Sequence, residues 1–144
     1  MKSHNCLRFT PLMTLLSLFL LPIDACAEVV VIVNQDNKIQ SLTASQLRDI
    51  FLGQSSEFPD GDIAIPADLP DGGPRDEFYL KYAEKSPQQM RAYWLKVLYT
   101  GKGVPPQKMP SADALKKLVA KNQGAIGYIE QKDVDNTVKV VPIK

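Results

Sequence analysis

The sequence predicts an α/β fold: a single three-layer lobe in which a small, mainly parallel sheet is flanked by helices. Three observations predict it. Residues 28–33 (EVVVIV) form a continuous β-branched run, which is typical of a strand buried on both faces. Segments with helical periodicity separate the strand-like segments, and this order favours parallel pairing. No internal repeat or low-complexity linker divides residues 28–144, so we expect them to form one domain.

Helix starts are marked by a capping residue or by a proline in the first turn. These signals are Thr43 with Gln46, Pro74, Ser86 with Pro87, and Ser111 or Asp113. The later strands are expected at 63–65, where Pro66 would end the strand, and at 125–129 and 137–141. Trp94 lies on the apolar face of the third helix, and this spacing favours a core position over a ligand platform.

Residues 1–27 have the features of a secretory signal. They combine a basic start, an apolar run at 11–23 and a small-x-small cleavage site at 25–27. The run is too short for a membrane span, which needs about 20 apolar residues. We therefore expect a soluble periplasmic protein. A lipoprotein acylated at Cys26 is the alternative, and Asp24 fits such a cleavage box poorly.

Composition excludes several classes of function. The chain has 17 Lys and Arg against 16 Asp and Glu. The signal segment holds Lys2, Arg8 and Asp24, together with every His and Cys of the chain, His4, Cys6 and Cys26. After cleavage the net charge would be zero, without the basic excess of a nucleic-acid binder. Cysteine or imidazole catalysis and thiolate or imidazole zinc sites would also be impossible. We expect no enzyme activity, no metal and no cofactor.

The candidate site is a glycine-rich turn that leads from the end of a strand into a helix. The first N–H groups of a helix are unpaired and carry partial positive charge. Gly72 and Gly73 allow the backbone to approach a ligand closely, and Arg75 adds a planar set of donors. Together these residues predict a cradle for a small inorganic or phosphorylated anion.

Other residues of the turn weaken this prediction. Pro74 removes one N–H group, and Asp68 and Asp71 bring negative charge into the same loop. A plain loop before a capped helix therefore remains an alternative. The turn at 101–103 (GKG) is a second candidate for a basic contact, although a helix end followed by a turn is favoured there.

Three segments of the chain match motifs of a known family in order. Residues 42–53 (LTASQLRDIFLG) match a helix written L-T-x-x-x-L-x-x-I-[FY]-L-G. The strand at 63–65, the glycine-rich turn and Phe78 match a strand, a phosphate loop and a helix, and residues 124–130 (GAIGYIE) match G-A-I-G-Y-x-E. The chain thus resembles the periplasmic phosphate-binding proteins of ABC uptake systems, of the type 2 periplasmic-binding-protein-like family. It resembles only the second of their two lobes.

The resemblance implies an exported, non-catalytic module that binds phosphate or a phosphate-like anion at Gly72, Gly73 and Arg75, linked to phosphate ABC transport. In the family, an Arg precedes a Ser-Gly-Thr run in the phosphate loop. When the chain is aligned on Phe78, Asp68 stands in place of that Arg, and only Gly73 is retained from the run.

These departures support an alternative, in which the same lobe has an eroded ligand site and works as an envelope interaction or adaptor module. The partner would then be an ABC permease, another envelope protein or a second copy of the chain.

Overall fold

The computed structural model describes residues 27–144. The expected signal segment, with the alternative acylation site at Cys26, lies outside the described residues except for its last residue. The described strands and α-helices are β1 (Val29–Asn34), α1 (Ala44–Phe51), β2 (Ile65–Asp68), α2 (Gly73–Ala83), α3 (Pro87–Thr100), β3 (Gln107–Lys108), α4 (Ala112–Lys121), β4 (Ala125–Glu130) and β5 (Val138–Val140). A 3-10 helix, η1 (Gln131–Asp133), follows β4. The predicted α/β class is confirmed.

The described strands form one mixed sheet in the order β3-β2-β4-β1-β5. β2 runs parallel to β3 and β4, whereas β1 runs antiparallel to β4 and β5. The expectation of a mainly parallel sheet is therefore wrong for β1. That expectation assumed that two strands joined through a helix run parallel. Here α1 is short, and after the long segment 52–64 the chain enters the sheet as β2 in the direction opposite to β1. β4 lies between β1 and β2 in the sheet, so β2 pairs with β4 and not with β1.

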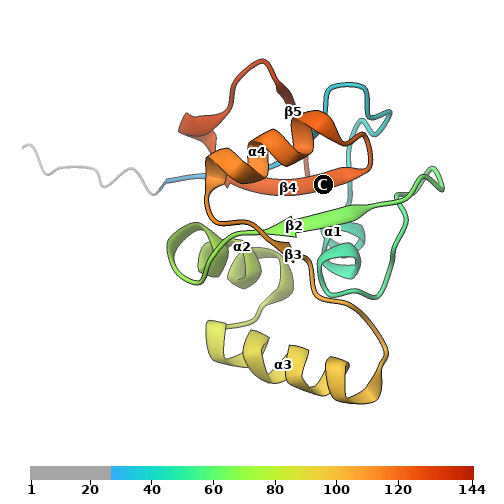
Figure 1. Ribbon diagram of the computed structural model, residues 1–144, viewed down its shortest axis with the longest axis vertical. Helices are drawn as coiled ribbons and strands as arrows, with labels where there is room; N and C mark the ends of the chain where they lie inside the picture. The colour runs from blue at the N-terminus through green and yellow to red at the C-terminus, as the bar shows by residue number, and fades with distance from the viewer. Residues whose placement is uncertain (1–26) are drawn as a thin grey trace, which may run out of the picture.

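Helices cover both faces of this sheet (Figure 1). α4 packs on β1 and β4 from one side, and α2, with α1 beside it, packs on the same strands from the other. These contacts give the three predicted layers. α3 contacts α2 and lies outside the layers, at the end of the molecule opposite α4. One helix is thus left with a free side.

Local capping explains where the helices begin. α1 and α3 each start with a complete capping box, in which the cap side chain and the third helical residue exchange hydrogen bonds with the backbone. The caps are Thr43 for α1, Ser86 for α3 and Ser111 for α4, all of which the sequence predicts. Gly101 ends α3 in the left-handed conformation, so the 101–103 turn is a helix end as favoured.

The second strand differs from the prediction. β2 begins at Ile65 and continues through Pro66 to Asp68 instead of ending at Pro66. Proline is tolerated there because β3 pairs only with the last two residues of β2, so the outer side of Pro66 is an open sheet edge. This extension positions the candidate functional site, because Asp68 is the last residue of the longer strand.

Aromatic side chains fill the core between the sheet and α1 and α2. Phe78 stacks on Tyr128 with ring centroids 4.0 Å apart, and Phe51 meets Phe78 edge-on at 4.7 Å. Trp94 is buried, as predicted. Among residues 27–144 no helix is long and apolar enough to cross a membrane.

Candidate functional site

Asp68, the last residue of β2, forms a buried ion pair with Arg75 in the first turn of α2. Arg75 Nε lies 3.0 Å from Asp68 Oδ2, and the two side chains are only 5% and 2% exposed. Opposite charges attract more strongly inside a protein than in water, and an unpaired charge there is costly. The guanidinium expected to hold an external anion therefore already holds an internal one.

Three further donors surround the same carboxylate. The Tyr79 hydroxyl donates to Asp68 Oδ2 at 3.2 Å, the Leu69 N–H donates to Oδ1 at 3.0 Å, and the Tyr128 hydroxyl donates to Oδ1. Both carboxylate oxygens thus accept two hydrogen bonds. We call Asp68, Leu69, Arg75, Tyr79 and Tyr128 the Asp68 cluster.

Secondary structure explains how the two tyrosines reach Asp68. Tyr79 follows Arg75 by four residues in α2, so both side chains lie on the same helix face, and the guanidinium carbon is 4.9 Å from the centre of the tyrosine ring. β2 and β4 run parallel with Ile65 opposite Ala125. Continuing that register places Tyr128 next to Asp68.

The charges of the Asp68 cluster stabilise each other. Burial alone would lower the pKa of the Arg75 guanidinium, but the adjacent Asp68 carboxylate outweighs burial and raises this pKa above its usual value. Burial, reinforced by the same carboxylate, raises the pKa values of Tyr79 and Tyr128 far above that of a free phenol. The phenols stay protonated and act as hydrogen-bond donors.

A second carboxylate connects this cluster to the surface. Asp71 Oδ1 lies 3.0 Å from Lys108 Nζ and 3.3 Å from Arg75 Nη1. The hydrogen bond from Lys108 is the main reason why the pKa of Asp71 falls below its usual range. Two acidic side chains therefore face the donors of Arg75, one from inside and one from outside.

The structure places the three predicted site residues at one helix start, with different surroundings. Gly72 precedes α2 with φ 113°, a value that favours glycine, and its N–H lies 3.4 Å from Asp76 Oδ1. Gly73 begins α2, and a Cβ atom at either glycine would meet no other atom within 4 Å. Arg75, in contrast, is 4% exposed and points towards Asp68. The ligand-binding role of the three residues stays a prediction.

The partners of Arg75 were not predicted from the sequence. Asp68 was considered an unfavourable charge and a replacement for the family's Arg, and Tyr128 was left outside the site. Two signals could have found them: the four-residue spacing from Arg75 to Tyr79, and a parallel pairing of the strand before the glycine-rich turn with the strand that carries Tyr128.

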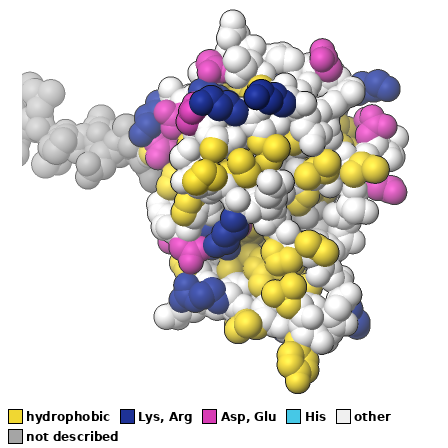
Figure 2. Space-filling model, viewed as in Figure 1, with side chains coloured by type: hydrophobic (Ala, Val, Ile, Leu, Met, Phe, Trp, Pro, Cys, Tyr) yellow, Lys and Arg dark blue, Asp and Glu magenta, His cyan; other side chains and the backbone are white. Residues whose placement is uncertain are grey.

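An apolar groove lies next to the Asp68 cluster, between α3 and the segment that follows it. It is an open depression of about 390 Å³, lined by Arg91, Trp94, Leu95, Leu98 and Pro105, with Asp71, Arg75 and Lys108 at one end. We call it the α3 groove. Figure 2 shows hydrophobic side chains gathered over this end of the molecule, with basic side chains beside them. In the described part of the chain, no group of three His, Cys, Asp or Glu side chains could hold a metal ion.

The fold and this site define a single α/β lobe in which a helix begins beside the end of a parallel strand. Solved structures that share this fold include proteins of phosphate transport. An ABC-type phosphate transport receptor from Vibrio cholerae superposes with a TM-score of 0.64 at 22% identity, over 80% of this chain and 45% of its own. A substrate-binding protein from Clostridium perfringens, assigned to phosphate ABC transport and solved with bound phosphate, gives 0.63 at 23% identity, over 80% and 44%.

PstS from Borrelia burgdorferi gives a TM-score of 0.60 at 12% identity, over 81% of this chain and 47% of its own. This chain therefore spans less than half the length of the solved proteins it matches. No protein-family model matches the sequence, and no curated protein matches it significantly. At these identities the similarity establishes the fold, and the resemblance to one lobe of the phosphate-binding proteins is confirmed at that level.

Proposed function

We propose that this chain is a non-catalytic binding module of the periplasm that engages an envelope protein, rather than free phosphate, at the end of the lobe where α2 begins. The observation that carries the proposal is the Asp68 cluster. Asp68 accepts hydrogen bonds from Arg75, both tyrosines and a backbone N–H, so the buried donors of the site are already satisfied.

Electrostatics supports the same proposal. A phosphate ion approaching Arg75 would meet Asp71 first, and Asp68 lies directly behind the guanidinium. Two carboxylates close to a dianion repel it, and the Gly72 N–H that could offset this repulsion already faces Asp76 Oδ1 at 3.4 Å.

The periplasmic location rests on the secretory features of residues 1–27 and on the fold, which the phosphate-transport proteins share. An ABC permease of a phosphate system is one candidate partner, and another envelope protein is the second. Residues 28–144 contain neither His nor Cys, which supports a binding role over catalysis.

A second candidate is a phosphate-like anion bound at Gly72, Gly73 and Arg75 for phosphate ABC transport. One observation favours it: no neighbouring atom lies within 4 Å of the position that a Cβ atom would take at either glycine, so an anion could approach the backbone from that side. Binding would require Asp71 to move away from Arg75 and Lys108.

Titration calorimetry with inorganic phosphate separates the two candidates. The proposal predicts no saturable heat at millimolar phosphate for the chain without its signal segment. Saturable heat that is lost in Arg75→Ala would establish the second candidate instead. The proposal also predicts an envelope protein that co-purifies with the chain. A mass that stays monomeric at all concentrations, with no co-purifying envelope protein, contradicts it.

A further inference from the structure

We propose that the α3 groove binds a protein segment that presents apolar side chains together with carboxylates, an inference that rests on the proposed binding of an envelope protein. The groove lies between α3 and the segment that follows it, and it is lined mainly by apolar side chains. Its occupant is defined by two properties of the lining residues, their apolar exposure and their charge.

The apolar exposure is concentrated on one face of α3. Leu95 and Leu98 are 70% and 57% exposed, although they are three residues apart on one helix face and line the same groove. Trp94 and Pro105 form the remaining apolar wall. A contiguous exposed apolar patch rimmed by charged residues is typical of an interaction site. The groove therefore fits apolar side chains of a partner.

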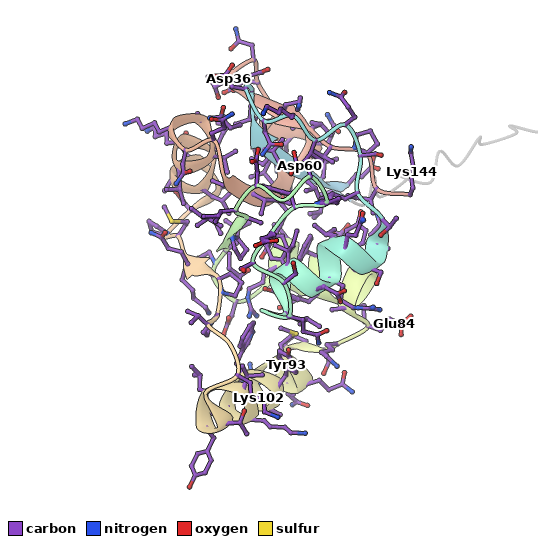
Figure 3. The ribbon with its side chains drawn as sticks, turned by 90° about the vertical axis from the view of Figure 1, so that its right-hand side faces the viewer. Asp36, Asp60, Glu84, Tyr93, Lys102 and Lys144 are labelled. Carbon is purple, nitrogen blue, oxygen red and sulfur yellow. The ribbon has the colours of Figure 1, made fainter. Side chains whose placement is uncertain are left out.

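The chain segment that carries α3 and the groove wall after it is basic, and Asp71 is the acidic residue at the exposed rim of the groove. Between Glu84 and Asp113 the chain carries five basic residues and no acidic one, although acidic and basic residues nearly balance over the whole chain. The five are Lys85, Arg91, Lys96, Lys102 and Lys108. Figure 3 places Lys102 at the α3 end of the molecule and Asp36 at the opposite end. An acidic partner would be attracted to this end specifically.

Arg91 provides the specific contact. Its side chain lines the groove and is exposed, and within residues 27–144 no acidic side chain forms an ion pair with it. Lys108, in contrast, is already 3.0 Å from Asp71. The Arg91 charge helps to lower the pKa of Asp71 in the same groove, but the two side chains form no ion pair. A partner carboxylate beside the apolar side chains would therefore meet a guanidinium with no ion-pair partner among residues 27–144, and such a group binds carboxylates in a planar two-donor geometry.

The same observations disfavour two other occupants. A second copy seated through the same face would bring like-charged surfaces together, and this repulsion opposes association. A membrane surface binds protruding apolar side chains, whereas Leu95 and Leu98 line a groove whose opposite wall is Pro105.

The sole tryptophan of the chain, Trp94, lines the groove and reports on it directly. The experiment follows its fluorescence while two synthetic helical peptides of about 15 residues are added, one of Leu and Glu and one of Leu and Lys in the same order. We expect a saturable change in emission with the Leu/Glu peptide only. We expect Arg91→Glu and Leu95→Glu each to weaken that binding about tenfold or more.

Two matched variants control for the reversal of a charge and for the loss of an exposed leucine. Lys121→Glu, on α4, makes the same charge change as Arg91→Glu at an exposed site far from the groove. Leu80→Glu changes another exposed leucine, 63% exposed on α2 and outside the groove. Both should bind the Leu/Glu peptide like the unmodified chain.

The inference would be overturned if the Leu/Glu peptide caused no response or if both peptides caused an equal response. It would also be overturned if the response were unchanged in Arg91→Glu and Leu95→Glu. A response to vesicles of phosphatidylglycerol in place of the peptide would count against it in the same way. A dimer that Leu95→Glu dissociates would also overturn it, in favour of a second copy. If the peptide fails while an envelope protein still co-purifies with Leu95→Glu, the groove is wrong and the proposed function stands.

Discussion

Arg75 Nε and Asp68 Oδ2 lie 3.0 Å apart in the interior, at the end of β2 where a cradle for an external anion was expected. The lobe thus supplies its own carboxylate to the donors of its candidate site. This relationship gives the Arg75 guanidinium a partner within the lobe itself.

The first prediction concerns the cost of removing that carboxylate. Asp68→Ala should lower the free energy of unfolding by about 3–5 kcal/mol, because it leaves the Arg75 charge buried without its partner. Chemical denaturation measures this change. Glu28→Ala, at an exposed position before β1, is the control and should have almost no effect. An equally small effect of Asp68→Ala would contradict the role of the ion pair.

The second prediction concerns alkaline pH. The folded-state pKa values of Tyr79 and Tyr128 lie above the value of 10.0 for a free phenol, so the unfolded chain loses these protons first as the pH rises. Their contribution to stability is complete below pH 10 and is lost above it, by about 1.4 kcal/mol per pH unit for each tyrosine.

Denaturation between pH 9 and pH 11 measures this slope. Replacing Tyr79 and Tyr128 together by Phe should flatten it, whereas Tyr99→Phe should not, because Tyr99 is 96% exposed. A slope that is the same in all three proteins would refute the explanation.

The third prediction tests the packing of β4. A Cβ atom on Gly127 would overlap the buried Leu115 side chain of α4, so Gly127→Ala should cost about 1–3 kcal/mol of stability. Gly73→Ala is the matched control, since no atom lies within 4 Å of its Cβ position. Thermal unfolding followed by circular dichroism separates the two. Equal midpoints would contradict the close approach of α4 to the sheet.

The fourth prediction concerns Asn34, whose side-chain Nδ2 donates to the Val119 and Ala120 carbonyls at 2.9 Å, at the end of α4. Asn34→Ala should lower the free energy of unfolding by about 1–3 kcal/mol, because these carbonyls lose a buried donor. Asn136→Ala, at an exposed position, provides the comparison in the same denaturation assay. Similar losses in both variants would argue against this contact.

Local features of the sequence were sufficient to predict the helix starts. Thr43, Ser86 and Ser111 cap through contacts within three residues, so spacing alone identifies them. The direction of β1 was not predictable in this way, because it depends on where the long segment 52–64 returns to the sheet.

For the candidate site too, local features were predictable from the sequence and long-range contacts were not. Gly72, Gly73 and Arg75 were located correctly at a helix start, since turn and helix signals are local. The partner of Arg75 was not, because its contact with Asp68 depends on β2 extending through Pro66, and the contact with Tyr128 depends on strand register. Contacts between residues distant in the sequence therefore determine whether Arg75 faces solvent or an internal carboxylate.

The most direct test of the account is chemical rescue of Asp68→Ala by formate. This variant removes the carboxylate and leaves Arg75, Tyr79 and Tyr128 as unsatisfied donors around a space of similar size. We predict that formate raises its unfolding temperature relative to chloride at equal ionic strength, with no such difference in the unmodified chain. Identical unfolding temperatures of Asp68→Ala in formate and chloride would contradict the claim that Asp68 fills the anion position of the lobe.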